Sequence, residues 1–178
     1  MGVMVALLRG VNVGGASTLP MGKLREVASA CGYEDVRTYI QSGNLVFSAP
    51  DSATAAGVAD ELRTAIAERT TVRPAVVVRT GDELAAVVDA NPFADRELAA
   101  VHVVFGPSAD DASIAGIDLG GFAPEEAVTR RRETYLFLPA GVGRSRLAAA
   151  ISRGKGGDGT MRSWRTVMKL LAMAGEPA

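Results

Sequence analysis

The chain has 178 residues, of which 48% are hydrophobic and 22% charged, and its formal net charge is −1. This composition is typical of a globular protein and excludes a fibrous or disordered one. The only cysteine, Cys31, excludes an internal disulfide and a multi-cysteine metal site. The longest apolar runs are far shorter than the ~20 residues of a membrane helix, and no basic segment precedes the first one. We therefore expect a cytoplasmic protein with no membrane partner.

The first half of the chain alternates between strand and helix patterns. A continuously apolar run at residues 3–8 predicts a buried strand. A glycine-rich loop follows, and Pro20 marks the first turn of a helix that ends before Gly32. Residues 36–41 and 45–47 are then predicted to form two more strands.

The short link between these two strands determines the predicted fold class. Three residues close an antiparallel hairpin but cannot make a parallel crossover, so a doubly wound nucleotide-binding fold is excluded for this half. A helix over residues 55–69 and a strand over 74–79 complete the series. Its order is that of the ferredoxin-like split unit, an α+β fold with two helices on one face of an antiparallel sheet.

The second half predicts a similar but less regular series. Its expected elements are a linking helix over residues 82–90, a strand over 100–105, a helical turn within 109–117, a hairpin of 127–131 with 133–138, a helix over 144–152, a flexible glycine link over 154–159 and a final helix from about Met161 to Ala174. We interpret the chain as two ferredoxin-like modules, residues 1–80 and 81–178. The second is expected to end in a helix instead of a strand.

Charge is unevenly distributed between these parts. Residues 81–128 carry a net charge of −9 and residues 129–178 one of +7. A basic segment favours an anionic partner. The alternative is that the acidic and basic segments face each other inside the protein.

Two polar loops are candidate binding segments. Residues 10–15 join a buried strand to a helix, where backbone N–H groups and the helix dipole favour an anion, and Arg9 and Asn12 would contact it. The hairpin tip offers Gln41, Ser42 and Asn44. In both loops the alternative is turn chemistry, since glycine and asparagine tolerate positive φ.

The basic C-terminal segment offers further cations. Arg144 precedes a predicted helix, where a guanidinium is easier to understand if it shares an anion with the free N–H groups. In the final helix, Arg162, Arg165 and Lys169 fall within about 60° of each other. The opposite side carries an apolar stripe, expected to be buried and composed of Trp164, Val167, Met168 and Leu171.

Catalytic side chains are few. His102 is the only histidine and lies in an apolar strand, which favours a structural role. Cys31 is placed at the end of a helix, where the dipole disfavours a thiolate. One histidine cannot make a two-histidine metal site, and the acidic residues show no ligand spacing, so we expect no metal and no cofactor.

Three motifs carry a resemblance to a known family. They are LLRGVNVGG at residues 7–15, TYIQSGNLVF at 38–47 and TMRSWRTV at 160–167. Together they resemble the domain-of-unknown-function 1697 family of bacterial proteins. The resemblance implies a two-part, ferredoxin-like α+β architecture and no established reaction. The chain departs from the family pattern at residues 16–18, where lysines are frequent, and at Ser163 and Arg165, where asparagines are usual.

The leading functional hypothesis is binding of a small anionic or phosphate-bearing ligand. The candidate site residues are Arg9, Asn12, Gln41, Ser42, Asn44, Arg144, Arg162 and Arg165. This hypothesis requires the bends at Asn12 and Asn44 to fold into one neighbourhood. The alternatives are nucleic-acid binding through residues 129–178, an enzyme without histidine or cysteine chemistry, and a partner-binding protein, and the sequence does not fix the oligomeric state.

Overall fold

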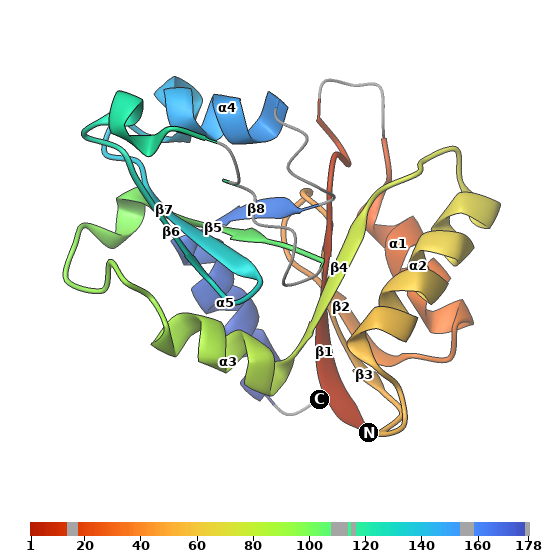
Figure 1. Ribbon diagram of the computed structural model, residues 1–178. Coiled ribbons are helices and arrows are strands. Elements are labelled where there is room, and N and C mark those ends of the chain that lie inside the picture. Colours follow the sequence, from red (N-terminus) through yellow and green to blue (C-terminus); the bar gives the residue numbers. More distant parts are fainter. Residues whose placement is uncertain (14–17, 108–113, 115–116, 154–158, 177–178) are drawn as a thin grey trace. The chain divides into compact units, whose positions relative to one another are not determined.

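The computed structural model describes residues 1–13, 18–107, 114, 117–153 and 159–176. The chain divides into two units, the first made of Met1–Ala85 with Lys169–Ala178 and the second of Ala86–Met168. Each unit contains one four-stranded antiparallel sheet with its own helices (Figure 1). The protein therefore has the mixed α+β fold that the sequence predicts.

Unit 1 has the predicted βαββαβ order of elements. These are β1 (Gly2–Leu8), α1 (Met21–Ala30), β2 (Glu34–Thr38), β3 (Asn44–Ala49), α2 (Ala55–Arg69) and β4 (Val76–Thr80), followed by the start of α3 (Gly81–Asp89). The strands lie in the order β2-β3-β1-β4, and every neighbouring pair is antiparallel. The long β1 strand is therefore central, and the loop that leads to α1 begins at its C-terminal end.

The core of unit 1 lies between its sheet and the helices α1 and α2, which cover the same face (Figure 1). Successive side chains of a strand point to opposite faces, so Met4, Ala6 and Leu8 of β1 all meet this core. Leu24 of α1 and Leu62 of α2 are fully buried against them. The apolar side chains that recur at helical spacing in the sequence are thus the ones that pack here.

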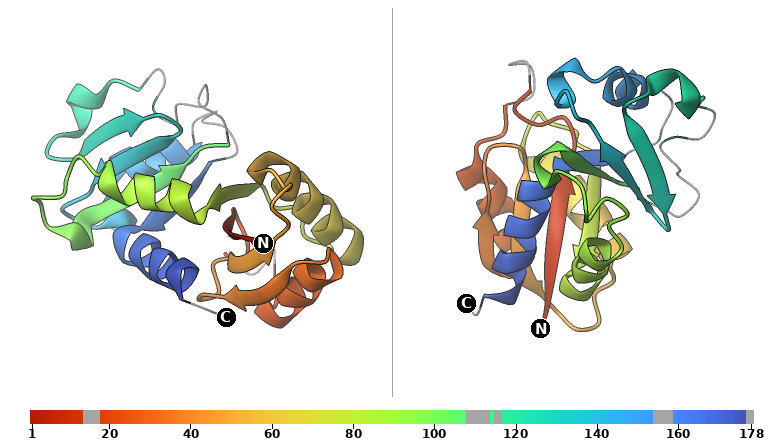
Figure 2. Two further views of the ribbon diagram at one scale, coloured as in Figure 1. Left: turned by 90° about the horizontal axis from the view of Figure 1, so that it is seen from below. Right: turned by 90° about the vertical axis from the view of Figure 1, so that its left-hand side faces the viewer.

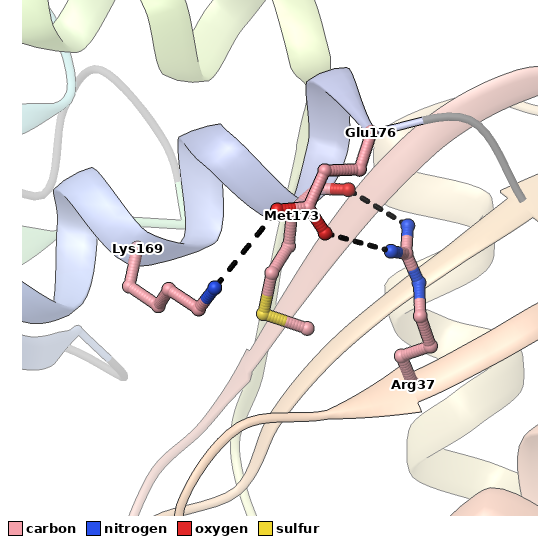
Figure 3. Close-up of polar contacts among 4 residues, drawn as sticks. All are labelled: Arg37, Lys169, Met173 and Glu176. Atoms are coloured by element: carbon pink, nitrogen blue, oxygen red, sulfur yellow. Dashed lines mark hydrogen bonds and ion pairs between the residues drawn. The ribbon is translucent and has the colours of Figure 1, made fainter.

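The opposite face of this sheet is also buried and carries an arginine. Val5 pairs directly with Val46 of β3 and with Arg79 of β4, and all three are almost fully buried. On the edge strand β2, Arg37 reaches the end of α5 (Trp164–Gly175), where its Nη2 donates to the Met173 carbonyl over 2.7 Å (Figure 3).

Unit 2 contains a second sheet with the same connectivity. Its strands are β5 (Val101–Phe105), β6 (Glu126–Arg130), β7 (Glu133–Phe137) and β8 (Thr160–Ser163), its longest helix within the unit is α4 (Arg146–Arg153), and its 3-10 turns are η1 (Leu98–Ala100), η2 (Leu119–Phe122) and η3 (Val142–Arg144). The strand order is β6-β7-β5-β8, again antiparallel throughout.

Helix α4 packs on one face of this second sheet (Figure 2). Its Leu147 and Ile151 contact the cluster that includes Val104 of β5 and Leu136 of β7. On the other face Tyr135 is buried, and its hydroxyl donates to the Val87 carbonyl over 2.7 Å. The buried Tyr135 hydroxyl is therefore paired, which offsets the cost of removing it from water.

The prediction of one helix from about Met161 was wrong. Residues Thr160–Ser163 form β8, which pairs with β5, and α5 begins only at Trp164. Ser163 caps the helix, because its Oγ accepts from the backbone N–H of Thr166 over 3.3 Å. A four-residue strand that runs directly into a helix leaves too little alternation to be recognised by periodicity.

The predicted basic stripe on the last helix is therefore also wrong. Arg162 lies in β8 and is 7% exposed, so it does not share a helix face with Arg165 and Lys169. The predicted apolar stripe is shifted too, since Met168 is 42% exposed. The buried side chains of α5 are Trp164, Thr166, Val167, Leu170 and Met173.

Two expectations fall on residues outside the described ones. The helical turn within residues 109–117 is described only at Ile114 and Ile117, and the glycine link of residues 154–159 only at Gly159. Where the chain is described, no helix has both the length and the apolar character that a membrane span requires.

Candidate functional site

The candidate site lies in unit 1, where the loop between β1 and α1 meets the tip of the β2–β3 hairpin. Gly10 has a φ of 74° and Asn12 one of 57°, with Val11 between them. Left-handed backbone in a tight bend of this kind can gather N–H groups into a concave anion-binding surface. A glycine and an asparagine are the residue types that adopt positive φ most readily.

The side chain of Asn12 holds this loop in place. Its Nδ2 donates to the Leu19 carbonyl over 2.9 Å and to the Gln41 carbonyl over 2.7 Å, and its Oδ1 accepts from the Leu19 N–H over 2.8 Å. One amide therefore links Asn12 to Leu19 across the loop and ties the loop to the hairpin. Leu19 precedes Pro20, the residue directly before α1, so these contacts tie the bend to the start of the helix.

Asn44 fixes the tip of the hairpin in the way that Asn12 fixes the loop. It is fully buried, and its Nδ2 donates to the Tyr39 carbonyl over 2.9 Å and to the Ser42 Oγ over 3.0 Å. The N–H of Tyr39 in turn donates to the Asn44 carbonyl over 3.1 Å. Asn12 and Asn44, both predicted as site residues, thus shape the site through hydrogen bonds within the chain, most of them to backbone atoms.

Gly43 lets the hairpin tip approach the end of β1. Its φ is 76°, and a Cβ at this position would lie 2.5 Å from Val11 Cγ2 and 2.8 Å from Leu8 Cβ. The Leu8 N–H donates to the Gly43 carbonyl over 2.8 Å. The two glycine-bearing bends, separated by some thirty residues in the sequence, therefore lie in contact, which confirms the expectation that they share one neighbourhood.

The surface of this junction combines polar and apolar groups. Gln41 is exposed, whereas Arg9 and Ser42 are half-buried. Val13 is 70% exposed and Ile40 50%. The junction thus combines Arg9, the bend of residues 10–12 and two exposed aliphatic side chains.

The start of α1 adds a favourable field for an anion. Along the described residues of α1 there is neither a side-chain N-cap nor an acidic residue in the first turn. By contrast, Thr54 Oγ1 caps α2 by accepting from Gly57 N–H over 3.1 Å. Uncapped N–H groups at a helix start carry partial positive charge.

The remaining predicted site residues belong to unit 2. Arg144 is exposed in η3 and Arg165 is exposed on α5. Arg162 is buried, donates through Nη1 to Thr160 Oγ1 over 2.7 Å and to the Met161 carbonyl over 2.8 Å, and burial lowers its pKa to about 10. Its guanidinium therefore belongs to the interior, which corrects the expectation of a surface cation.

An anion was expected beside Arg144 at the start of α4, and the protein supplies one itself. Glu125 Oε2 accepts from the Leu147 N–H over 2.9 Å, and Ser145 Oγ accepts from the Ala148 N–H over 2.8 Å. Arg146 stacks over the Phe122 ring at 5.7 Å from its centroid. This helix start is therefore already occupied by a carboxylate and a hydroxyl.

His102 and Cys31, the two residues considered for catalysis, have environments that favour their uncharged forms. Burial lowers the pKa of His102, and its Nδ1 lies 3.4 Å from the Ala100 carbonyl. Burial, and then the charge of Glu61, raise the pKa of Cys31. A neutral imidazole and a protonated thiol fit the structural roles inferred from the sequence.

Sequence reasoning missed two polar groups. Arg79 is 2% exposed in β4 and donates through Nη1 to the Val78 carbonyl over 2.9 Å. Tyr33 donates a hydrogen bond to Glu61, beside a shallow pocket of about 400 Å³ between α1 and α2 that Cys31 also lines. An arginine directly after the valines of β4 could have indicated a buried guanidinium. The Tyr33–Glu61 pair joins residues far apart in the sequence, and no local pattern predicts it. Among the described residues, no group of three histidine, cysteine or acidic side chains could hold a metal.

The architecture defines a protein of two α+β units, and comparison with known proteins agrees. The model of the family described as protein of unknown function DUF1697 matches residues 1–135, so the chain belongs to this family. The fold is similar to that of the conserved bacterial protein SP0830 from Streptococcus pneumoniae. That structure has a TM-score of 0.81 at 22% sequence identity, over 97% of this chain and 98% of the other. No curated protein matches the chain in sequence.

Proposed function

We propose that the protein binds a small anionic ligand, one carrying a phosphate or carboxylate group, at the junction of the β1–α1 loop with the β2–β3 hairpin. The observation that carries this proposal is the paired positive φ of Gly10 and Asn12, 74° and 57°, in a loop fixed to the hairpin by the Asn12–Gln41 hydrogen bond. A backbone held in this form offers N–H groups to an anion without further ordering.

Charge supports the same site. Arg9 precedes the bend, and the start of α1 follows it within a loop that Asn12 closes at Leu19. A guanidinium and uncapped helix N–H groups both stabilise negative charge. We favour a small ligand over nucleic acid because Arg162, one of the cations of the basic segment 129–178 on which that alternative depended, is buried.

The test is a titration of isotope-labelled protein with inorganic phosphate, followed by amide NMR. We expect shifts centred on residues 10–13 and 40–42, and a loss of affinity of about fivefold or more in Arg9→Gln, from removal of one charge-assisted contact. The matched control is Arg63→Gln, which removes an exposed arginine on α2 that pairs only with Asp60 among the contacts seen for it. Arg144→Gln and Arg165→Gln extend the series to the exposed cations of unit 2.

Two outcomes would contradict the proposal. One is the absence of localised shifts at tens of millimolar phosphate. The other is an equal loss of affinity in Arg9→Gln and Arg63→Gln, which would indicate only nonspecific charge attraction.

A further inference from the structure

The backbone of Ile40 is unusual for its residue type. Its φ is 50°, in the left-handed region that β-branched side chains rarely adopt. The cost arises because the branched Cβ crowds the neighbouring carbonyl oxygen. Glycine or asparagine at this position would relieve that strain.

Hydrogen bonds on both sides impose this conformation. Asn44 Nδ2 donates to the carbonyl of Tyr39, and Asn12 Nδ2 donates to the carbonyl of Gln41. Both asparagines are themselves fixed by further contacts. The residue between the two clamped carbonyls is therefore held in one conformation whatever its side chain.

Packing does not explain why this residue is isoleucine. Half of Ile40 is exposed, so its side chain contributes little apolar burial to offset the strain. Strained positions that the surrounding structure enforces are typical of ligand-binding segments. The aliphatic side chain of Ile40 is therefore better explained by contact with a ligand than by packing within the chain.

Val13 supplies a second aliphatic group at the same junction. It is 70% exposed and follows Asn12, while Ile40 precedes Gln41, so the two flank the 2.7 Å Asn12–Gln41 hydrogen bond. Among the described residues of unit 1, the large hydrophobic side chains that are exposed are Val13, Ile40 and the terminal Met1. The exposed aliphatic surface of this unit is therefore concentrated where the anion is proposed to bind.

From these observations, and resting on the proposed function, we infer that the ligand is an anion attached to an apolar body, which contacts Val13 and Ile40 while the anionic group meets the loop at residues 10–13. An organic phosphate or carboxylate with an aromatic or aliphatic group fits this chemistry. A free inorganic anion would leave both side chains without a role.

The test compares inorganic phosphate with phenyl phosphate by calorimetric titration. Wild-type protein is expected to bind phenyl phosphate about tenfold more tightly, the effect of removing some 50–60 Å² of apolar surface from water. In Ile40→Asn and Val13→Ser the preference for phenyl phosphate over inorganic phosphate, measured as the ratio of the two affinities in the same variant, is expected to fall to about threefold or less. Ile40→Asn should not lower the melting temperature, since asparagine tolerates the left-handed region.

Each outcome separates this inference from the proposed function. Val142→Ser, which removes an aliphatic side chain of unit 2 that is 47% exposed, is the matched control and should keep the full preference. Equal affinity for the two probes, or a preference that survives both substitutions, overturns the inference and leaves anion binding standing. Failure of both probes to bind overturns the proposed function and the inference together.

Discussion

The two sheets have the same strand order, so their strands correspond one to one. In unit 1 the order is β2-β3-β1-β4 and in unit 2 it is β6-β7-β5-β8. Val5 pairs with Arg79 in the first sheet, and Val103 pairs with Arg162 in the second. Each arginine is buried and donates to the carbonyl of the residue before it. One sheet design, including a buried guanidinium on its fourth strand, is therefore used twice.

The two sheets differ at the hairpin between their second and third strands. In unit 2 the hairpin is closed by two residues, Arg131 and Arg132, whereas in unit 1 the corresponding connection runs through residues 39–43. The longer tip contains the strained Ile40 and the crowded Gly43. Because two residues suffice to turn the chain at this place, the longer tip is not required by the sheet, which supports a functional role for it.

The largest expected effect is at Gly43. Alanine there should lower the free energy of unfolding by about 3 kcal/mol or more, since it combines left-handed strain with a Cβ that would lie 2.5 Å from Val11 Cγ2. The matched control is Gly141→Ala in unit 2, with φ 80° and no atom within 4 Å of the added Cβ, which should cost about 1 kcal/mol. Urea unfolding of both variants gives the comparison.

Equal losses of unfolding free energy in Gly43→Ala and Gly141→Ala would contradict this prediction. They would show that the hairpin tip yields easily and that the close approach of the two loops is not held by packing. Both variants carry the strain of a left-handed alanine. A further loss of stability in Gly43→Ala alone would show that the loop junction is a rigid part of unit 1.

The sequence was sufficient for the parts of the fold with clear periodicity. The apolar run of β1, the helical spacing of α1 and α2, and the short link between β2 and β3 predicted the element order of unit 1. Strand β8 was missed because its residues Thr160–Ser163 are too few to show alternation and continue directly into a helix. That error placed Arg162 on a helix face, where its spacing to Arg165 suggested a basic stripe.

The candidate site was predictable in its location but not in its internal roles. Glycine and asparagine at the two bends indicated turns, and both bends do contribute to the junction. Whether an asparagine amide contacts a ligand or its own backbone depends on partners such as Leu19 and Gln41, which only the folded chain brings within reach. The strain at Ile40 likewise arises from two hydrogen bonds that no local sequence pattern encodes.

The two units are expected to differ in how their stability depends on pH. The register places His102 of β5 where β1 has Met4, because each precedes the valine that pairs with the buried arginine. Burial lowers the pKa of His102 below its usual 6.5, so below that pH the unfolded chain takes up a proton that the folded protein does not. The free energy of unfolding should therefore be constant above this range and fall with decreasing pH, by no more than about 1.4 kcal/mol for each pH unit.

The measurement is urea unfolding between pH 7.5 and 5 for the wild type and for His102→Met, which gives unit 2 the residue found in unit 1. The substitution should remove the component of the pH dependence that belongs to His102. Identical pH profiles for the two proteins would show that this histidine is not shielded in the folded state.

A smaller effect is expected at the edge strands. The register aligns Arg37 of β2 with Val128 of β6, since each pairs with the residue of the third strand that faces the central valine. Arg37 donates to the Met173 carbonyl and pairs with Glu176 over 3.5 Å at the end of α5, where Lys169 also approaches Glu176 (Figure 3). Arg37→Val should cost about 1 kcal/mol and speed amide hydrogen exchange at residues 172–176. Arg25→Val, which removes a donor to Thr38 at the same edge, is the control and should leave that exchange unchanged.

The smallest difference is expected between the N-caps of the helices that precede the fourth strand in each unit. Ser145 caps α4 and is 5% exposed, with Glu125 accepting a second N–H of the same turn, whereas Thr54 caps α2 in exposed surroundings. Ser145→Ala should cost about 1 kcal/mol or slightly more, because it leaves a buried N–H without its acceptor. Thr54→Ala should cost only about 0.5 kcal/mol, since water can replace the threonine hydroxyl. Thermal unfolding of the pair resolves this difference, and a larger cost for Thr54→Ala would mean that burial does not decide the strength of these caps.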